Sequence, residues 1–414
     1  MVYLTHLKKF TQDLFDHPEL GFKEFRTSKK VIDELKVLNP TCQIERFSET
    51  GIKTCLNPGK ELNIAFIAEL DSVYAPSHFN SDKETGAAQN CGHYTQVAIA
   101  MALYQKLIMN EDYKKWDYTL HFIFVPAEEY LDLDYRQQLV DEGKIVHFGG
   151  KPEAMRLGIF DNIDAAYCVH SIGEKFSEPT IELNCNLAGF LYKYYTFKGK
   201  ATHAGFDPFN GVNAYSMSTL FNTGIGLSRQ QFNDTQSIRI NPIIMKSDMS
   251  TNVIPNEVTI GTDLRCQSID YMTHVAEKLD KIAQGSAYAL EGQVDITTQM
   301  GYLPFVQNDL LNDLARTVYE QTPAITRLID DRGSIAAAGD IGDLAFMIPC
   351  AQISYGGFAG TIHGDDFQLV DEDFVLDTFP NYLLNLFNHL NGNLSKEMLY
   401  KKTYHEYKAL IESI

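Results

Sequence analysis

The chain has 414 residues, which favours two domains over one, and its 44% hydrophobic content is ample for a sizeable core. A formal net charge of −19 disfavours nucleic acids and anionic membranes as partners, because both attract basic surfaces. The seven cysteines are scattered and never paired as CxxC, which argues against a disulfide framework and predicts a reducing, cytoplasmic location.

The N-terminal part alternates helix and strand signals. Its first 20 residues predict a helix of the fold and not a secretion signal. Residues 62–70 (LNIAFIAEL) and 119–125 (TLHFIFV) are short apolar runs that predict buried strands, and Pro126 ends the second because proline cannot extend a central strand. Residues 94–107 between them predict a buried helix. This order predicts a parallel sheet covered by helices.

From about Ala188 the order of the predicted elements changes to β-α-β-β-α-β, which is typical of a ferredoxin-like module. The elements are strand 190–198, helix 212–228, strands 237–245 and 258–266, helix 270–290 and strand 294–300. Helix and strand then alternate again, at 309–321 and 351–355. We therefore predict an α/β fold, with a helix-flanked mixed sheet in segments 1–187 and 302–414 and an inserted α+β domain at 188–301.

Five places carry side chains of metal-binding type at the ends of predicted elements. They are Glu69 with Asp71, Cys91 with His93, Glu128 with Glu129, His170, and His363. In extended backbone, residues two apart face the same side, so the members of the first two pairs can point into one site. Adjacent glutamates face opposite sides, so one can bind a metal while the other moves protons.

Each of these places has an ordinary structural explanation when taken alone, such as a core histidine or a solvated loop. Their combination is informative, because α/β folds place their sites at the carboxyl ends of parallel strands. The sequence therefore predicts one site that gathers these side chains.

The order of motifs resembles the amidohydrolase subfamily of the aminoacylase/carboxypeptidase metallopeptidases, which includes auxin-conjugate and aminobenzoyl-glutamate hydrolases. The matching motifs are HPELGFKEF (17–25), ELD (69–71), NCGH (90–93), FVPAEE (124–129), GKATHAG (199–205), NVIPNEV (252–258), LRC (264–266), AGDIGDL (338–344) and TIHGDDF (361–367). They extend over essentially the whole chain. The upstream CGH with PAEE is the most specific pairing.

The resemblance implies a catalytic domain interrupted by a lid or dimerisation domain, and a role for each matched residue. The implied metal ligands are Cys91, His93, Glu129, His170 and His363. Glu128 would be the general base, Asp71 would orient a ligand, and His203, from the partner subunit, would stabilise the oxyanion. Asn252 and Arg265 would bind the substrate carboxylate; an ordinary strand-surface charge is the alternative for Arg265.

The implied activity is cleavage of the amide bond of N-acyl amino acids, amino-acid conjugates or short peptides by a metal-bridging water. The resemblance implies two divalent metal ions. A metal suits this reaction because it lowers the pKa of bound water to about 7, which makes a nucleophile available at neutral pH. A set of thiolate, imidazole and carboxylate ligands suits zinc, with manganese, nickel or cobalt as alternatives. The implied partners are a small acyl-amino-acid or peptide substrate and a second copy of the chain, with no nucleic acid and no membrane.

Three features depart from the family pattern. Tyr94 stands where relatives have an acidic or amide residue, and Gln96 where many have a second histidine. Segment 130–146, which follows Glu129, is longer than usual; it either lines the pocket mouth or is a tolerated surface insertion.

Two other functions stay open at this stage. One is a degenerate, non-catalytic family member that acts as a binding protein, with Tyr94 as its main support. The other is a thiol enzyme centred on Cys91, with His93 as the activating base. The second leaves the glutamate pair and the remaining histidines without a role.

Overall fold

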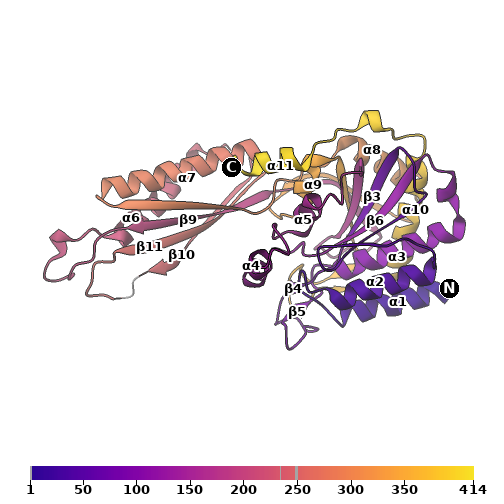
Figure 1. The fold of residues 1–414 in the computed structure, drawn as a ribbon, viewed down its shortest axis with the longest axis horizontal. Coiled ribbons are helices and arrows are strands. Elements are labelled where there is room, and N and C mark those ends of the chain that lie inside the picture. The colour runs from indigo at the N-terminus through magenta and orange to yellow at the C-terminus, as the bar shows by residue number, and fades with distance from the viewer. Residues whose placement is uncertain (1, 234, 248–249) are drawn as a thin grey trace. The chain divides into compact units, whose positions relative to one another are not determined.

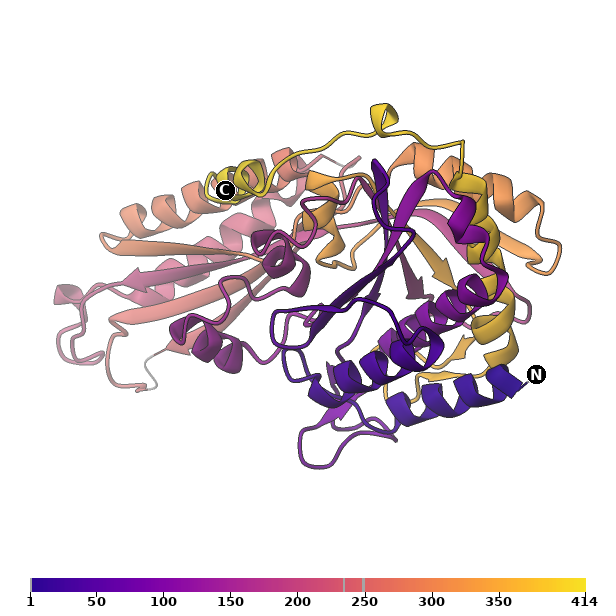
Figure 2. The same cartoon turned by 45° about the vertical axis from the view of Figure 1, so that its right-hand side comes forward.

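The computed structural model describes residues 2–233, 235–247 and 250–414, and the backbone alone for Val2. The chain divides into two compact units (Figures 1 and 2). Unit 1 comprises residues 1–185, 306–333 and 343–409, and unit 2 comprises 186–305, 334–342 and 410–414. The division into a catalytic domain and a lid domain, with boundaries at 187/188 and 301/302, stays a prediction.

Unit 1 is built on an eight-stranded mixed sheet with the order β1-β2-β6-β3-β7-β14-β8-β13. The strands are β1 (Glu45–Phe47), β2 (Gly51–Leu56), β3 (Leu62–Glu69), β6 (Tyr118–Val125), β7 (Ala165–Ser171), β8 (Thr180–Leu187), β13 (Arg327–Ile335) and β14 (Cys350–Tyr355). Two small hairpins add β4 (Val73–Tyr74) with β5 (Ala87–Ala88), and β15 (Phe358–Ala359) with β16 (Gln368–Leu369). The central strands β6, β3, β7 and β14 run parallel, as the sequence predicts for β3 and β6.

Helices flank this sheet, which confirms the predicted fold class. The helices that lie wholly or mostly in unit 1 are α1 (Val2–Phe15), α2 (Phe25–Leu38), α3 (His93–Asn110), α4 (Leu133–Asp141), α5 (Gly150–Arg156), α8 (Asp309–Glu320), α9 (Ile341–Met347), α10 (Phe379–Leu390) and α11 (Tyr404–Ile411). The predicted buried helix is α3, which packs on β3 and is itself covered by α1, α2 and α10. Its apolar residues from Tyr94 to Leu107 are buried on every side, which explains why its sequence shows little amphipathic pattern.

Unit 2 is centred on a four-stranded antiparallel sheet with the order β10-β11-β9-β12. Its elements are β9 (Gly189–Lys198), α6 (Ala214–Ser228), β10 (Ile238–Ser247), β11 (Glu257–Cys266), α7 (Ile269–Ala289) and β12 (Gln293–Met300). This β-α-β-β-α-β order confirms the predicted module. The two helices bury Phe221, Met272 and Val275 against Tyr195 and Ile260 of the sheet, giving the unit a core of its own.

In the part of the chain that the structure describes, no helix is both long and apolar enough to cross a membrane. Segment 130–146 is not an extended surface loop, because residues 133–141 form α4. No sequence pattern predicted β8 and β13, which lie at one edge of the large sheet. The polar residues of β13 explain why its strand pattern is weak.

Candidate metal-dependent active site

The register of the parallel strands brings the predicted ligands to one edge of the unit 1 sheet. Glu69, the last residue of β3, pairs with Val125, the last residue of β6. Ile67 pairs with Cys168 in β7, and Ser354 of β14 pairs with His170. The segments that follow these strands therefore leave the sheet at the same level, as expected for a site at the carboxyl ends of parallel strands.

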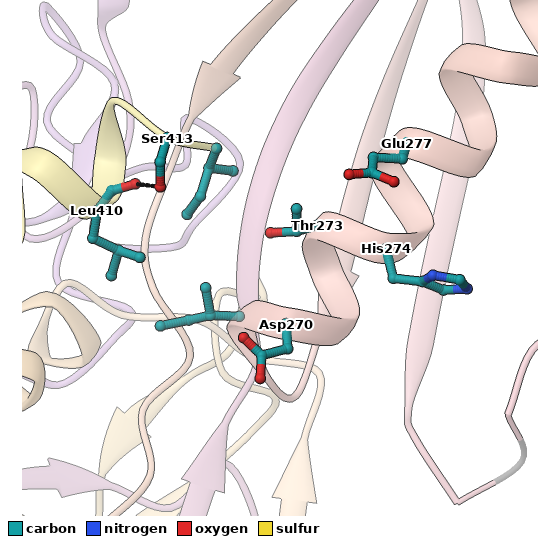
Figure 3. A pocket seen from close by; sticks show the side chains of 8 residues that line it. Asp270, Thr273, His274, Glu277, Leu410 and Ser413 are labelled. Atoms are coloured by element: carbon teal, nitrogen blue, oxygen red, sulfur yellow. Dashed lines mark hydrogen bonds between the residues drawn. The ribbon is translucent and has the colours of Figure 1, made fainter.

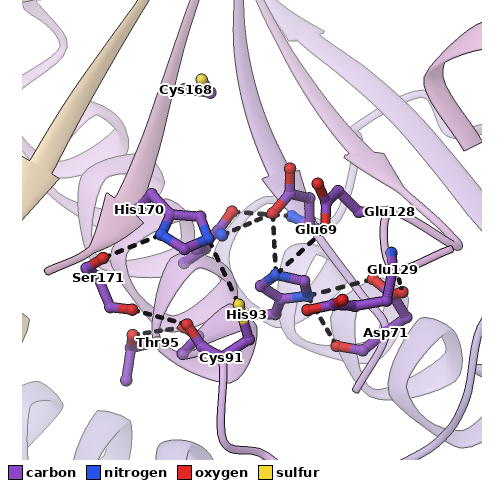
Figure 4. A network of polar contacts seen from close by, with 12 residues as sticks. Glu69, Asp71, Cys91, His93, Thr95, Glu128, Glu129, Cys168, His170 and Ser171 are labelled. Carbon is purple, nitrogen blue, oxygen red and sulfur yellow. Dashed lines mark hydrogen bonds and ion pairs between the residues drawn. The ribbon is translucent and has the colours of Figure 1, made fainter. Parts of the chain in front are cut away.

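His93, the first residue of α3, lies between the two carboxylates of the ELD motif (Figure 4). Its Nδ1 is 3.0 Å from the carbonyl oxygen of Asp71 and 3.2 Å from Asp71 Oδ1. Its Nε2 is 3.2 Å from Glu69 Oε2 and 3.8 Å from Glu128 Oε2. Because a carbonyl can only accept a hydrogen bond, Nδ1 carries a proton, and Nε2 is the atom directed at the carboxylates.

The remaining predicted ligands lie around Cys91. Its Sγ is 3.5 Å from His170 Nε2, and His170 Nδ1 is 2.9 Å from the carbonyl oxygen of Ser171, which fixes the ring. On the other side, His363 Nε2 is 3.1 Å from Glu129 Oε1. The histidines of this cluster thus direct Nε2 toward thiolate or carboxylate, and those of His93 and His170 are oriented by oxygens at Nδ1.

Three groups of possible ligands have donor atoms within 4.8 Å of one another: Cys91, His93 and His170; Cys91, Glu129 and His363; and Glu69, His93 and Glu128. The Nε2 atom of His93 is buried and has no hydrogen-bond partner of acceptable geometry among the described residues. An imidazole nitrogen that faces two carboxylates without a well-formed hydrogen bond suits a cation between them. Cys91 belongs to the first and second of these groups, and His93 belongs to the first and third. The residues present therefore fit a metal centre.

Gly92 makes the close spacing of Cys91 and His93 compatible with the start of α3. Its φ of 95° lies in the left-handed region, and a Cβ at this position would come within 2.8 Å of Ser171. A larger residue would therefore separate the CGH turn from the end of β7, where His170 stands.

Glu128 and Glu129 lie on a short loop after β6, and the side chains of two buried acidic residues accept hydrogen bonds from its main chain. Ala127 has a φ of 54°, which is unfavourable for a residue with a side chain. Its N–H donates to Glu24 Oε1 at 2.8 Å, and the N–H of Glu129 donates to Asp71 Oδ2 at 2.9 Å. These two acceptors hold the loop in a conformation that directs Glu128 and Glu129 to different groups of the cluster.

The pKa values of the cluster reflect mutual attraction of acids and bases. Burial alone would raise the pKa of the Cys91 thiol, but His93 and His170 outweigh it and lower that pKa to about 6. Burial would lower the pKa of His363, whereas its contacts with Cys91 and Glu129 raise it to about 11. The imidazoles and the neighbouring acidic groups thus stabilise one another's charged forms.

Sequence reasoning gave no role to Lys151, the buried second residue of α5. Its Nζ lies 2.6 Å from Glu69 Oε1, and the side-chain amide of Gln96 donates to Glu69 Oε2 at 2.8 Å. Burial would raise the pKa of Glu69, but Lys151 and then His93 lower it to about 2. The departure at Gln96 therefore serves to hold Glu69 beside His93. Lys151 and Glu69 are 82 positions apart, so no local pattern in the sequence predicts their contact. The charge of Lys151 was the only signal.

Tyr94, the other departure, points away from the cluster. It is buried in the core of unit 1, with its ring 5.1 Å from that of Phe15. It is therefore a core aromatic and adds no ligand to the cluster.

Two of the predicted unit 2 residues lie side by side. The N–H of Ala204 donates to the carbonyl oxygen of Asn252 at 2.8 Å, and His203 pairs with Val253. His203 Nδ1 accepts hydrogen bonds from the N–H groups of Gly205 and Phe206, at 3.2 and 3.0 Å. The proton of a neutral His203 is therefore on Nε2, which makes that atom a hydrogen-bond donor.

Arg265 lies at the other end of the same sheet. It pairs with Phe190 at the start of β9, whereas Glu257, which follows the Asn252 motif, pairs with Lys198 at the end of β9. Eight residues of strand separate Glu257 from Arg265, or about 26 Å. The Arg265 Nε donates to Asp263 at 2.9 Å, and Nη1 donates to the carbonyl oxygen of Ala336 at 2.9 Å. The structure thus does not bring Asn252 and Arg265 together within one chain.

Unit 2 also has a shallow hollow of about 370 Å³ beside α7 (Figure 3). It is lined by Ile269, Asp270, Thr273, His274, Glu277, Leu410, Ser413 and Ile414. None of the predicted site residues contributes to it, and its lining residues form no group of three possible metal ligands in the described parts of the chain.

The fold and the side chains gathered at this site fit an α/β metallohydrolase, and comparison with known proteins gives the family. Residues 65–380 match the model of peptidase family M20/M25/M40. The chain therefore belongs to this family, whose members hydrolyse amide and peptide bonds.

Individual relatives are distant but similar over most of their length. The N-acetylcysteine deacetylase of Bacillus subtilis is 25% identical over 74% of this chain and 76% of its own. The Xaa-Arg dipeptidase of Mus musculus is 23% identical over 83% of this chain and 74% of its own. The solved structure of the Bacillus subtilis YXEP protein, a dinuclear metal binding peptidase, covers 95% of this chain and 99% of its own, with 19% identity and a TM-score of 0.75.

The buried ion pair of Lys151 gives a prediction for stability. Lys151→Met should lower the free energy of unfolding by about 3–5 kcal/mol, because it leaves the Glu69 charge buried without its partner. Adding Glu69→Gln should recover a large part of this loss, since neither charge then remains. Urea unfolding of both variants checks this; a double variant no more stable than Lys151→Met would contradict it.

Glu24 gives a prediction for pH dependence. Burial, with the nearby charge of Asp71, raises the pKa of this carboxyl to about 8. The folded state then holds a proton that the unfolded state loses near pH 4.5, so this contribution to stability is present below that pH and is lost as pH rises to 8. Each pKa unit is worth about 1.4 kcal/mol.

A neutral Glu24→Gln variant should therefore gain stability relative to wild type as pH rises from 5 to 8. Urea unfolding midpoints at these two pH values measure the gain. Glu61→Gln, at an exposed site, is the control and should show no such trend. An equal difference from wild type at both pH values would disprove the raised pKa.

Proposed function

We propose that this protein is a metal-dependent amidohydrolase that cleaves the amide bond of N-acyl amino acids, amino-acid conjugates or short peptides. The main observation behind this proposal is that the Glu128 carboxylate lies 3.8 Å from His93 Nε2, within a cluster of possible metal ligands. These ligands are Cys91, His93, Glu129, His170 and His363. The named activities of the relatives, a deacetylase and a dipeptidase, support this class of substrate. They give no support to a non-catalytic binding protein.

The cluster would hold two divalent metal ions, most suitably zinc, with manganese, nickel or cobalt as alternatives. When bound, such ions lower the pKa of water and polarise a carbonyl oxygen. Cys91, His93 and His170 form one group of donors, and Cys91, Glu129 and His363 form the other, so Cys91 would be shared. Asp71 keeps the proton of His93 on Nδ1, which leaves Nε2 available as a ligand.

Glu128 would be the proton carrier of the reaction. It is buried beside His93, on a loop fixed by Glu24 and Asp71, and its neighbour Glu129 is engaged with His363. In this position its carboxylate can accept a proton from the attacking water and later donate it to the leaving amine nitrogen. The division of work between two adjacent glutamates follows from their opposite directions in the chain.

His203 would donate from Nε2 to the oxygen that becomes negative in the tetrahedral intermediate. The two backbone N–H groups that occupy Nδ1 support this role, because they favour the tautomer with a donor at Nε2. Asn252 lies beside it and would contact the same end of a substrate. Arg265 would bind the substrate carboxylate through the part of its guanidinium that Asp263 and Ala336 leave open.

The separation of Arg265 from His203 and Asn252 supports a homodimer. About 26 Å of strand lies between the two ends of β11, which is too far for both to contact one small substrate from one chain. A complete site would then combine Arg265 of one copy with His203 and Asn252 of the other. The outer strand β10 exposes Ile243, Ile244 and Met245, a surface suited to pairing with a second copy. A cytoplasmic location stays a prediction.

Glu128 is tested by the isosteric variant Glu128→Gln. We expect hydrolysis of a panel of N-acetyl amino acids and dipeptides to fall by about 10²–10⁴-fold, because the proton carrier is lost. Metal analysis of protein purified without chelator should show two equivalents in the variant as in wild type. Glu61→Gln is the matched surface control. Wild-type protein that takes up no metal on titration would refute the proposed function.

Shared sites are tested by mixing two inactive variants, Glu128→Ala and His203→Ala. Each should be inactive alone, but a mixed dimer should contain one site with both residues intact. After unfolding and refolding of an equal mixture, we expect about a quarter of wild-type activity. A mixture that stays as inactive as its components would show that His203 acts within its own chain or not at all.

A further inference from the structure

Residues 130–146, the segment that the sequence analysis predicts to be an insertion, carry a buried arginine. Arg136 lies on α4 and has no exposed surface, although it follows a candidate metal ligand by only seven positions. Burying a guanidinium is costly unless its donors are used. Its hydrogen bonds therefore show what the inserted helix does.

Arg136 bridges the two ends of the inserted segment. Its Nη2 donates to the carbonyl oxygen of Glu129, where the segment starts, and its Nη1 donates to the carbonyl oxygen of Phe148, where the segment ends, at 2.5 Å. The planar fork of an arginine is suited to two such bonds at once. One side chain thus closes the segment and holds the main chain of Glu129.

The surroundings of Arg136 leave it little freedom. The guanidinium lies over the ring of Phe22 at 5.6 Å, and a Cβ on Gly21 would come within 2.6 Å of Nη2 and 2.8 Å of Ala127 Cβ. Leu139, on the same helix, packs with Phe22 and Ala127 in a small apolar cluster. The side chain is therefore fixed between the segment after α1 and the loop that carries Glu128 and Glu129.

The peptide groups on both sides of Glu129 are thus held by ionic side chains. Its N–H donates to Asp71 Oδ2 at 2.9 Å, and its carbonyl accepts from Arg136. The carboxylate of the same residue lies 3.1 Å from His363 Nε2. With the main chain fixed at both ends, this carboxylate loses little further freedom when it binds a cation.

We propose that Arg136 is a positioning residue for Glu129, so that the inserted helix α4 is a built part of the metal site. This inference rests on the proposed function. Residues that orient metal ligands typically change metal affinity by about 10–100-fold when they are replaced. Arg136→Met should weaken zinc binding by about that factor and lower kcat, with KM nearly unchanged.

The experiment measures zinc affinity by competition with a chromophoric chelator, beside unfolding midpoints and steady-state kinetics. Arg136→Lys is the conservative variant and should weaken zinc binding less than Arg136→Met, because an ammonium can still reach one carbonyl. Leu139→Ala removes packing from the same helix, and Gln137→Ala changes an exposed residue beside it. Leu139→Ala should lower the unfolding midpoint while zinc affinity stays near wild type, and Gln137→Ala should change neither.

Wild-type zinc affinity in both Arg136 variants would overturn the inference. So would a loss in Leu139→Ala equal to that in the Arg136 variants, because the role would then be structural only. If Arg136→Met does not fold, Arg136→Lys against Leu139→Ala decides by the same comparison. A wild-type protein that binds no zinc or other divalent metal would instead refute the proposed function itself.

Discussion

The level at which the parallel strands end is the constraint on which the site depends. Pairing of Glu69 with Val125 puts the ends of β3 and β6 side by side, and β7 continues the same edge with His170. The turns that follow can then place carboxylates, thiol and imidazoles within a few ångströms of one another. A slip of one residue in either pairing would turn the ligands to the opposite face of the sheet.

Bringing so many charges together in a buried place requires that each be balanced. Glu69 is balanced by Lys151, Glu129 by His363, and the Cys91 thiol by His93 and His170. A buried charge without such a partner would cost several kcal/mol. A metal held by this cluster would take the place of protons on the imidazoles, because histidine binds a metal in its neutral form.

Unit 2 is organised for a different purpose. Its sheet and two helices form an independent core, so its loops and strand ends can carry polar residues without destabilising unit 1. His203 and Asn252 are joined by backbone pairing at one end of the sheet, and Arg265 is anchored by Asp263 at the other. This spacing is a fixed property of β11, and it supports the proposal that a complete site draws on two copies of the chain.

The sequence by itself determined strands β3 and β6 with helix α3, the element order of the ferredoxin-like unit 2 and the ligand candidates, because apolar runs, proline stops and two-residue spacing are local patterns. It did not show that Glu24, Lys151 and Arg136 support the site, because their partners lie far along the chain or are backbone atoms that leave no mark in the sequence. The family resemblance implies that Asn252 and Arg265 bind one carboxylate, whereas within one chain the length of β11 separates them. Only tertiary structure decides such contacts, since they depend on strand register and on which loops meet at one edge of the sheet.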